Sequence, residues 1–410
     1  MSQNIGILGA GIVGVCCALE LQRRGFQTTI YDRNEPISET SFGNAGVLSV
    51  GSIHPQAGPG VWRHLPRFFL NRDSRVHVNH RHLFSMAGFL RNYLACCTES
   101  MHRQNAHWLH QLLSRSVEAH RTLIMESGSD QLLSEKGWLT LYRNTATPPA
   151  LASELLREFD VAFETLDTAG IQHMEPHLGR VYKSGLWIKN TAAISNPGLL
   201  GKNYTHLYAG RGGVIIRSEI ERLEAVTQGW KVHGHHGLAQ HDQLIMAMGA
   251  WNQPMLASLG CQLPLIAERG YHQHFQPQPG TVLSRPILDN DFGFVLAPMD
   301  MGYRLTSGVE WAPLDSAPTP VQLAQVATKV REAFPLADKT GPIWMGNRPE
   351  TPDCLPIIGS VPGYSNLYLA TGHGHLGLTL SAITGVALAR QMNNEPSDID
   401  LAPYSAARFM

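Results

Sequence analysis

The amino-terminal part of the chain alternates short apolar runs with a glycine-rich turn. Residues 5–8 form an apolar run, residues 12–25 carry apolar side chains at helical spacing, and residues 28–31 (TTIY) form a short run of β-branched and aromatic side chains. Short apolar runs bounded by turns predict strands, whereas the longer amphipathic run predicts a helix. The order strand, helix, strand predicts a βαβ unit of a parallel sheet.

Helical and extended patterns continue along the chain. Helices are predicted where apolar side chains recur at helical spacing, at 83–127, 151–159, 197–209, 321–334 and 377–392. Strands are predicted between turns, at 137–142, 214–217, 230–233, 243–248, 271–275, 281–283, 292–297, 303–306, 309–311 and 367–369.

Strand and helix patterns alternate near both ends of the chain, and the middle is richer in strands. This layout predicts an α/β fold whose Rossmann-like domain the chain leaves and re-enters. We place this domain at residues 1–82, 195–265 and 335–410. A second α+β domain, built on a mainly antiparallel sheet, is placed at 83–194 and 266–334. A ligand crevice is expected between the two domains.

The composition is that of a globular protein with no general attraction to nucleic acid. The 410 residues are 43% hydrophobic and 16% charged, with a formal net charge of −1. No apolar run approaches the roughly 18 residues of a membrane span, and the first strand begins too early for a signal peptide. We therefore expect a cytoplasmic protein, with peripheral contact at the inner face of the cell membrane left open. Cysteine and histidine spacings predict no metal site.

The turn after the first strand carries a Gly-x-Gly-x-x-Gly motif, formed by Gly9, Gly11 and Gly14. Glycines here permit a tight turn, a close approach to a pyrophosphate and close packing of helix on strand. Asp32 ends the second strand, where a carboxylate accepts hydrogen bonds from ribose hydroxyls and would repel the ribose phosphate of NADP. The motif therefore predicts a dinucleotide site but does not separate FAD from NAD.

A second glycine-rich strand-to-helix turn lies near the carboxyl terminus, in the segment NLYLATGHGHLGLT at 366–379. Its backbone N–H groups and helix start could stabilise negative charge on a ring oxygen of a reduced flavin. The alternative is an ordinary capped helix.

Arg348 lies in the proline-rich segment GNRPETPDCLPIIG, at 346–359. A guanidinium held by a rigid segment suits bidentate binding of a carboxylate. The alternative is a structural salt bridge with Glu350 or Asp353.

Taken together, these segments resemble the FAD-dependent D-amino-acid oxidase superfamily, and most of all bacterial D-amino-acid dehydrogenases of the small-subunit type, with glycine oxidase as a relative. The resemblance also rests on ETSFGNAG at 39–46, DQLIMAMGAW at 242–251, ERGYHQHF at 268–275 and IDLAPYSAARF at 399–409. It implies a Rossmann-like FAD-binding domain and non-covalent FAD. Residues 194–201 depart from the acid-rich stretch typical of alanine-type dehydrogenases.

The resemblance also implies roles for individual residues. Arg348 would bind the substrate carboxylate, and Tyr271 would lie on the substrate side. The FAD site would comprise Gly9, Ala10, Gly11, Ile12, Val13, Gly14, Asp32, Arg33, Thr40, Ser41, Asn44, Ala45, Gly46, Ile220, Gly249, Trp251, Gly346, Gly374, His375, Leu376, Gly377, Leu378 and Thr379.

The implied reaction is oxidation of the C–N bond of a small amino or imino acid by hydride transfer to flavin N5. Two alternatives remain at this point: an FAD-binding subunit of a heteromeric amine or hydroxyproline dehydrogenase complex, and an NAD-dependent dehydrogenase. The sequence leaves open whether the electron acceptor is a quinone, O2 or a partner protein, and whether the chain forms homo- or hetero-oligomers.

Overall fold

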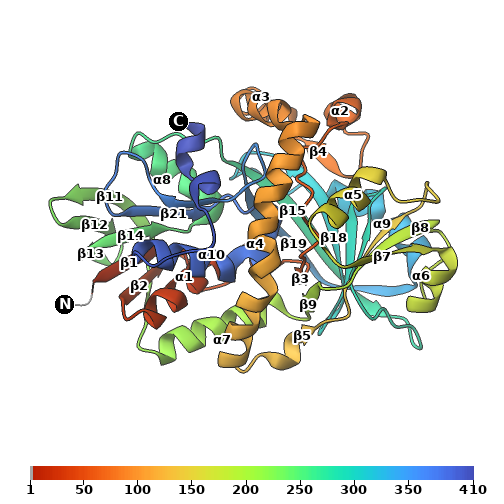
Figure 1. Ribbon diagram of the computed structural model, residues 1–410, viewed down its shortest axis with the longest axis horizontal. Helices are drawn as coiled ribbons and strands as arrows, with labels where there is room; N and C mark the ends of the chain where they lie inside the picture. Colours follow the sequence, from red (N-terminus) through yellow and green to blue (C-terminus); the bar gives the residue numbers. More distant parts are fainter. Residues whose placement is uncertain (1–2) are drawn as a thin grey trace.

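The computed structural model describes residues 3–410 and confirms the predicted βαβ unit (Figure 1). It consists of β1 (Asn4–Leu8), α1 (Ile12–Arg23) and β2 (Gln27–Asp32). β1 lies between β2 and β14 (Gln243–Met246) and is parallel to both. The six-stranded sheet has the order β10-β2-β1-β14-β21-β20. Its other strands are β10 (Val214–Arg217), β20 (Ile357–Ser360) and β21 (Leu367–Thr371).

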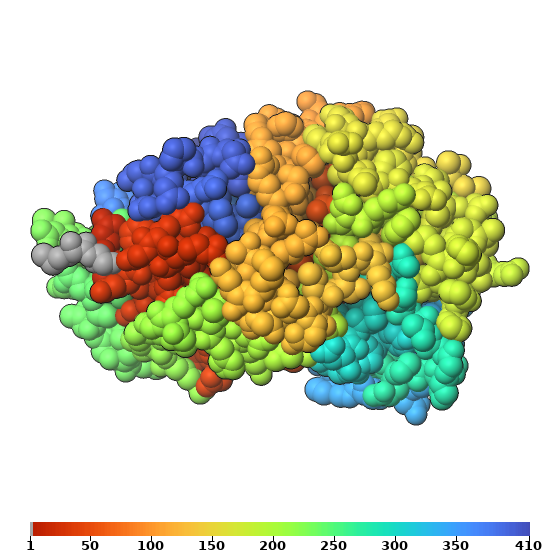
Figure 2. Space-filling model, turned by 60° about the horizontal axis from the view of Figure 1, so that its bottom comes forward, coloured from red at the N-terminus to blue at the C-terminus, as the bar shows by residue number. Residues whose placement is uncertain are grey.

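Helices from distant parts of the chain cover this sheet. They are α4 (Glu99–Glu126), α7 (Pro197–Gly210) and α10 (Gly377–Met392). In Figure 2 the blue carboxyl-terminal segments lie beside the red amino-terminal segments and the orange α4. α1 and α10 pack so closely that a Cβ on Gly385 would lie 2.7 Å from the Cys16 carbonyl oxygen. Across residues 3–410, no helix is long and apolar enough to cross a membrane.

A larger, mainly antiparallel sheet forms the second half of the molecule, which confirms the predicted fold class. Its main path runs β19-β15-β18-β17-β16-β6-β8-β7, and β4 pairs with β18. The strands are β4 (Val76–Val78), β6 (Trp138–Tyr142), β7 (Phe163–Asp167), β8 (Ser184–Ile188), β15 (Ile266–Pro277), β16 (Ile287–Asp289), β17 (Phe294–Met299), β18 (Gly302–Trp311) and β19 (Leu336–Glu350).

Shorter elements complete the fold. Two three-stranded sheets comprise β11 (Ile220–Val226), β12 (Gly229–Gly234) and β13 (Gly237–His241), and β3 (Val47–Leu48), β5 (Leu133–Ser134) and β9 (Ala192–Ile194). The remaining α-helices are α2 (Val61–Phe69), α3 (Ala87–Cys96), α5 (Ala150–Glu158), α6 (Thr168–Met174), α8 (Asn252–Ser258) and α9 (Val321–Ala333).

The structure differs from the sequence-based prediction in a few segments. β4 and β19 belong to the second sheet, although we had placed both in the Rossmann-like domain. The predicted strands at 303–306 and 309–311 are one strand, β18, and 281–283 is not a strand. Leu283 is buried as a loop residue, so its apolar character reflects packing rather than strand pairing. The exact domain boundaries stay a prediction.

A buried histidine joins three helices of the Rossmann-like half. His120 of α4 donates through Nε2 to the Leu378 carbonyl of α10 at 2.8 Å, and its Nδ1 lies 3.1 Å from the Tyr204 hydroxyl of α7. Burial lowers the pKa of His120 to about 4. The ring is therefore neutral at pH 7 and supports the first turn of α10.

We expect His120 to make the protein sensitive to acid. In the unfolded chain the His120 imidazole binds a proton near pH 6.5, whereas in the folded chain it stays neutral down to about pH 4. The contribution of the neutral His120 to the free energy of unfolding is therefore complete above about pH 6.5 and is lost as the pH falls toward 4. The loss amounts to roughly 3 kcal/mol by linkage. Urea unfolding of His120→Gln should show a stability deficit that shrinks by about this amount as pH falls. A pH-independent deficit in His120→Gln would contradict the assignment.

Candidate functional site

A cavity of about 990 Å³ is lined by residues of both large sheets. Most of the predicted site residues line it, namely Gly9, Gly11, Ile12, Val13, Asp32, Arg33, Thr40, Ser41, Asn44, Ala45, Ile220, Gly249, Trp251, Gly346, Arg348, Gly374, His375, Leu376, Gly377, Leu378 and Thr379. Ala10, Gly14, Gly46 and Tyr271 are not among the lining residues. The crevice expected between the two halves is therefore present.

The first glycine turn leaves no room for side chains at two of its glycines, Gly9 and Gly14. Gly9 has φ +111°, and a Cβ there would lie 2.5 Å from the Ala247 carbonyl oxygen. A Cβ on Gly14 would lie 2.0 Å from the Gly9 carbonyl oxygen, although Gly14 does not itself face the cavity. Gly14 therefore serves helix packing, while Gly9 and Gly11 form the cavity wall as a pyrophosphate site requires.

Asp32 and Arg33 define the end of the cavity beyond this turn. Asp32 Oδ2 accepts a hydrogen bond from Ala10 N at 2.7 Å, and Oδ1 accepts one from Asn34 N at 2.9 Å. The Arg33 guanidinium lies 4.6 Å from the centre of a Trp251 ring. Ile220 lines the same cavity. This end combines a carboxylate with flat side chains, which suits the ribose and adenine of a dinucleotide.

The loop at 40–46 is held in the cavity wall by a buried arginine that the sequence analysis had missed. Arg304 of β18 has 0% exposure and donates to the carbonyl oxygens of Phe42 and Asn44. Its Nε also donates to His274 Nε2 at 3.1 Å. Burial lowers the pKa of Arg304 to about 10, and among residues 3–410 it forms no ion pair with a carboxylate. Arg304 therefore adds a buried positive charge behind this loop.

Trp344 is a second residue that the sequence analysis had missed. It lines the cavity and stacks on His272, with ring centres 4.8 Å apart. Cβ atoms on Gly43 and Gly346 would lie 2.2 and 2.1 Å from its ring atoms. These two glycines therefore let the indole join the 40–46 loop to β19. The strand itself was not predicted, so no pattern had marked this tryptophan.

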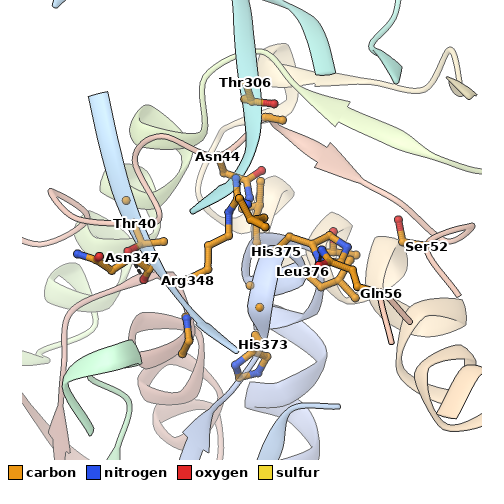
Figure 3. A pocket seen from close by; sticks show the side chains of 18 of the residues that line it. Thr40, Asn44, Ser52, Gln56, Thr306, Asn347, Arg348, His373, His375 and Leu376 are labelled. Carbon is orange, nitrogen blue, oxygen red and sulfur yellow. Dashed lines mark hydrogen bonds between the residues drawn. The ribbon is translucent and has the colours of Figure 1, made fainter. Parts of the chain in front are cut away.

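The second glycine turn brings a neutral imidazole to the cavity. His375 lines the cavity and its Nδ1 lies 3.1 Å from Gln56 Nε2. Burial, aided by the nearby Arg348 cation, lowers the pKa of His375 to about 4. Figure 3 shows His375 and Leu376 at the cavity, between Arg348 and Gln56. His375 is therefore uncharged at pH 7 and can act as a hydrogen-bonding group.

Arg348 extends into the cavity (Figure 3), and its side chain lies across Gly270 of the neighbouring strand. A Cβ on Gly270 would lie 2.1 Å from Arg348 Nη2. Among the described residues, the guanidinium forms no hydrogen bond or ion pair. Asp353 pairs instead with Arg408, at 2.7 Å. The structural salt bridge considered as an alternative is therefore absent from residues 3–410.

Two buried carboxyl groups lie near Arg348 without neutralising it. Burial raises the pKa of Glu268, and burial together with Glu268 raises the pKa of Glu350 well above its usual range. Burial lowers the pKa of Arg348, against the attraction of both carboxyl groups. An arginine remains charged even so, whereas a raised pKa favours protonated acids. The cavity therefore holds a guanidinium that no carboxylate binds directly within residues 3–410, an arrangement that suits an anionic ligand.

Tyr271 does not share this environment. Its side chain is 1% exposed, its hydroxyl donates to Glu310, and it accepts from Thr319 N at 2.9 Å. Adjacent residues of a strand face opposite sides, so Gly270 faces Arg348 while Tyr271 faces the core behind the sheet. This placement gives no support to a substrate-side role for Tyr271.

The residues present fit FAD. The cavity joins the Gly9–Gly11 turn to the second glycine turn, a span that a two-part cofactor with a pyrophosphate between its rings would occupy. Asn347 Oδ1 adds a buried acceptor without a partner among the described residues, in the same wall as Thr40 and Arg348. Such an acceptor suits the ring N–H of an isoalloxazine.

Known proteins resemble this chain over its whole length. The family model described as FAD dependent oxidoreductase matches residues 4–391. A D-amino-acid oxidase of Bradyrhizobium diazoefficiens is 30% identical, with 100% of this chain and 99% of that protein covered. A D-amino acid dehydrogenase of Methylobacterium nodulans is also 30% identical, with 98% of each covered. The glycine oxidase structure from Geobacillus kaustophilus shares the fold, with a TM-score of 0.76, 19% identity and 100% of both chains covered.

Proposed function

The chain belongs to the FAD-dependent oxidoreductase family, and we propose that it oxidises the C–N bond of a small amino or imino acid whose carboxylate binds Arg348. The observation that carries this proposal is the half-buried guanidinium of Arg348, which has no hydrogen bond or ion pair within residues 3–410. Relatives named D-amino-acid oxidase and D-amino acid dehydrogenase support the substrate class.

In the proposed reaction, the protein mainly positions the substrate. FAD, when bound, takes up the electrons and the hydrogen released by oxidation of the C–N bond. Arg348 binds the carboxylate through two N–H groups and fixes the orientation of the α-carbon. Gly270 leaves the space that this side chain needs, and the neutral His375 offers a hydrogen bond without adding charge. The imine product hydrolyses to a keto acid, or stays cyclic when the substrate is proline-like.

The wall beyond Arg348 supports a substrate with an apolar side chain. Across the larger sheet, the cavity is lined by Val295 of β17, Leu288 of β16 and Leu186 of β8. These apolar side chains favour substrate side chains larger than that of glycine. We therefore rank apolar D-amino acids above glycine, sarcosine and hydroxyproline isomers as substrates.

The decisive experiment is anaerobic titration of the purified holoprotein with a panel of D-amino acids, L-amino acids and cyclic imino acids. We expect a flavin spectrum that is bleached by one class, with apolar D-amino acids the most effective. A flavin that no member of the panel reduces would refute the proposed substrate class. It would instead favour a subunit that needs a partner protein for activity.

Reoxidation of the substrate-reduced protein identifies the electron acceptor. Fast recovery of the spectrum in air would indicate an oxidase, whereas slow recovery in air and fast recovery with a soluble quinone would indicate a dehydrogenase. Recovery only after a cell extract is added would indicate a partner protein. Sedimentation of the same sample gives the oligomeric state.

The pH dependence of kcat/KM should reflect the pKa of the substrate amine rather than the pKa of a side-chain base. The pKa values of His54 and His375 are lowered to about 4, chiefly by burial, so neither ring titrates near neutrality. We therefore expect kcat/KM to rise by about one log unit per pH unit below the pKa of the substrate ammonium, while kcat stays nearly flat. A substrate with a less basic amine should shift the profile to lower pH. A limb near pH 6.5 that vanishes in His375→Gln would contradict this assignment.

A further inference from the structure

The surface around α2 carries large apolar side chains that face solvent. We call this surface the α2 patch and define it by Trp62, Arg63, Arg67, Leu70, Arg72, Arg81 and Phe84. Trp62 is 53% exposed, Leu70 is 61% exposed and Phe84 is 93% exposed. Figure 1 shows α2 and α3 together at the upper edge of the molecule, outside the sheets. Aromatic and apolar side chains exposed together mark an interaction surface.

The patch is also strongly basic. Residues 61–97 contain six arginines and one acid, Asp73, so their formal charge is +5. The whole chain has a net charge of −1, so the rest of the chain has a formal charge of −6. Arg75 pairs with Asp73 at 2.7 Å. The other five arginines, Arg63, Arg67, Arg72, Arg81 and Arg91, are exposed and form no ion pair among residues 3–410. Their charge is therefore available to an anionic partner.

The inner side of the patch is anchored, so its outer side is a fixed surface. Phe68 of α2 is buried in a cluster with Phe89 and Tyr93 of α3, and Val61 and Leu65 pack against the same cluster. Helical spacing places Trp62 and Arg63 away from this buried side. α2 thus presents aromatic and cationic side chains outward without unfolding.

We propose that the α2 patch docks the protein on the surface of an anionic lipid bilayer. Tryptophan and phenylalanine among arginines are typical of helices that lie in a membrane interface, with arginine binding lipid phosphates. The unpaired positive charge gives complementarity to anionic headgroups. The three apolar side chains of the patch are too few for the continuous apolar core of a stable protein interface.

The docking surface borders the catalytic cavity. Val61, His64 and Phe68 of α2 line that cavity, as does Tyr93 of α3. A protein held by the outer side of α2 therefore keeps this part of the cavity wall close to the bilayer. A lipid-soluble molecule that enters the cavity beside α2 would have a short path from the membrane.

Co-sedimentation of the holoprotein with lipid vesicles tests the proposal. We expect binding to vesicles of equal parts phosphatidylglycerol and phosphatidylcholine, weak binding to pure phosphatidylcholine, and release by salt. The triple variant Arg63→Gln, Arg67→Gln, Arg81→Gln should lose roughly fivefold in affinity per arginine, about a hundredfold in total. Trp62→Ser with Phe84→Ser should also weaken binding. Activity on a soluble substrate with an artificial acceptor should stay unchanged in both.

A matched control removes three exposed lysines elsewhere, Lys183→Gln, Lys202→Gln and Lys339→Gln, and should bind vesicles as the wild type does. No binding to anionic vesicles at low salt would overturn the proposal, as would equal losses in the control and patch variants. A dimer in sedimentation that Trp62→Ser with Phe84→Ser converts to a monomer, without vesicle binding, would assign the patch to a second copy instead. These outcomes do not depend on the substrate, so they are separate from the test of the proposed function.

Discussion

Replacing Arg348 with alanine should lower kcat/KM by roughly two to three orders of magnitude, while FAD content stays near that of the wild type. The side chain has no hydrogen bond or ion pair within residues 3–410, so its removal breaks no internal salt bridge. What is lost is the binding of a carboxylate by a half-buried cation, which is worth about 2–5 kcal/mol. Stopped-flow reduction of the flavin by the best substrate measures this loss directly.

Two further variants distinguish carboxylate binding from a structural role. Arg348→Lys keeps the charge but loses the two-pronged geometry, so it should recover only part of the activity. Gly270→Ala keeps Arg348 but places a methyl group where its Nη2 now lies, so it should raise KM. Arg222→Ala, an exposed arginine of β11, is the control and should be silent. An Arg348→Ala enzyme within a few-fold of wild type would refute the carboxylate role.

The cofactor half of the site was predictable because its chemistry is local in the sequence. Gly9 and Gly11 lie within a few residues of each other. Their predicted role, a tight turn that lets the backbone approach a pyrophosphate, depends on backbone geometry alone. The family match confirms the resemblance, the oxidoreductase class and the FAD cofactor that these motifs implied. The roles of individual residues, including those that line the cavity, stay predictions.

The substrate half was harder to predict because it depends on strand pairing between distant segments. Arg348 lies over Gly270 only because β19 pairs with β15, and β19 contains glycine and proline that hide its strand pattern. The same pairing turns Tyr271 away from the cavity. One sequence signal could have identified Arg304. It is a charged residue within a predicted strand, and a buried charge usually has a structural or functional role.

Replacing Arg304 with methionine should weaken FAD binding by about 10- to 100-fold. The variant keeps much of the side-chain volume but leaves the carbonyl oxygens of Phe42 and Asn44 without their donor. Each buried acceptor left unpaired costs about 1–3 kcal/mol, so the loop at 40–46 should relax away from the position that lines the cavity. Loss of a buried positive charge should also lower the reduction potential of bound FAD, because that charge stabilises an anionic reduced flavin. Reconstitution of the apoprotein with FAD and a redox titration measure the two effects.

A second buried arginine separates loop positioning from general destabilisation. Arg269 is 0% exposed and likewise donates to backbone carbonyls, those of Pro313, Leu314 and Ser316, but these residues do not line the cavity. Arg269→Met should therefore lower the free energy of unfolding without changing FAD affinity or potential. Arg304→Lys, which keeps the charge but loses part of the hydrogen bonding, should retain the potential better than the affinity. Equal FAD affinity in the two methionine variants would show that Arg304 stabilises only the fold. An unchanged reduction potential in Arg304→Met would show that the charge of Arg304 does not stabilise the reduced flavin.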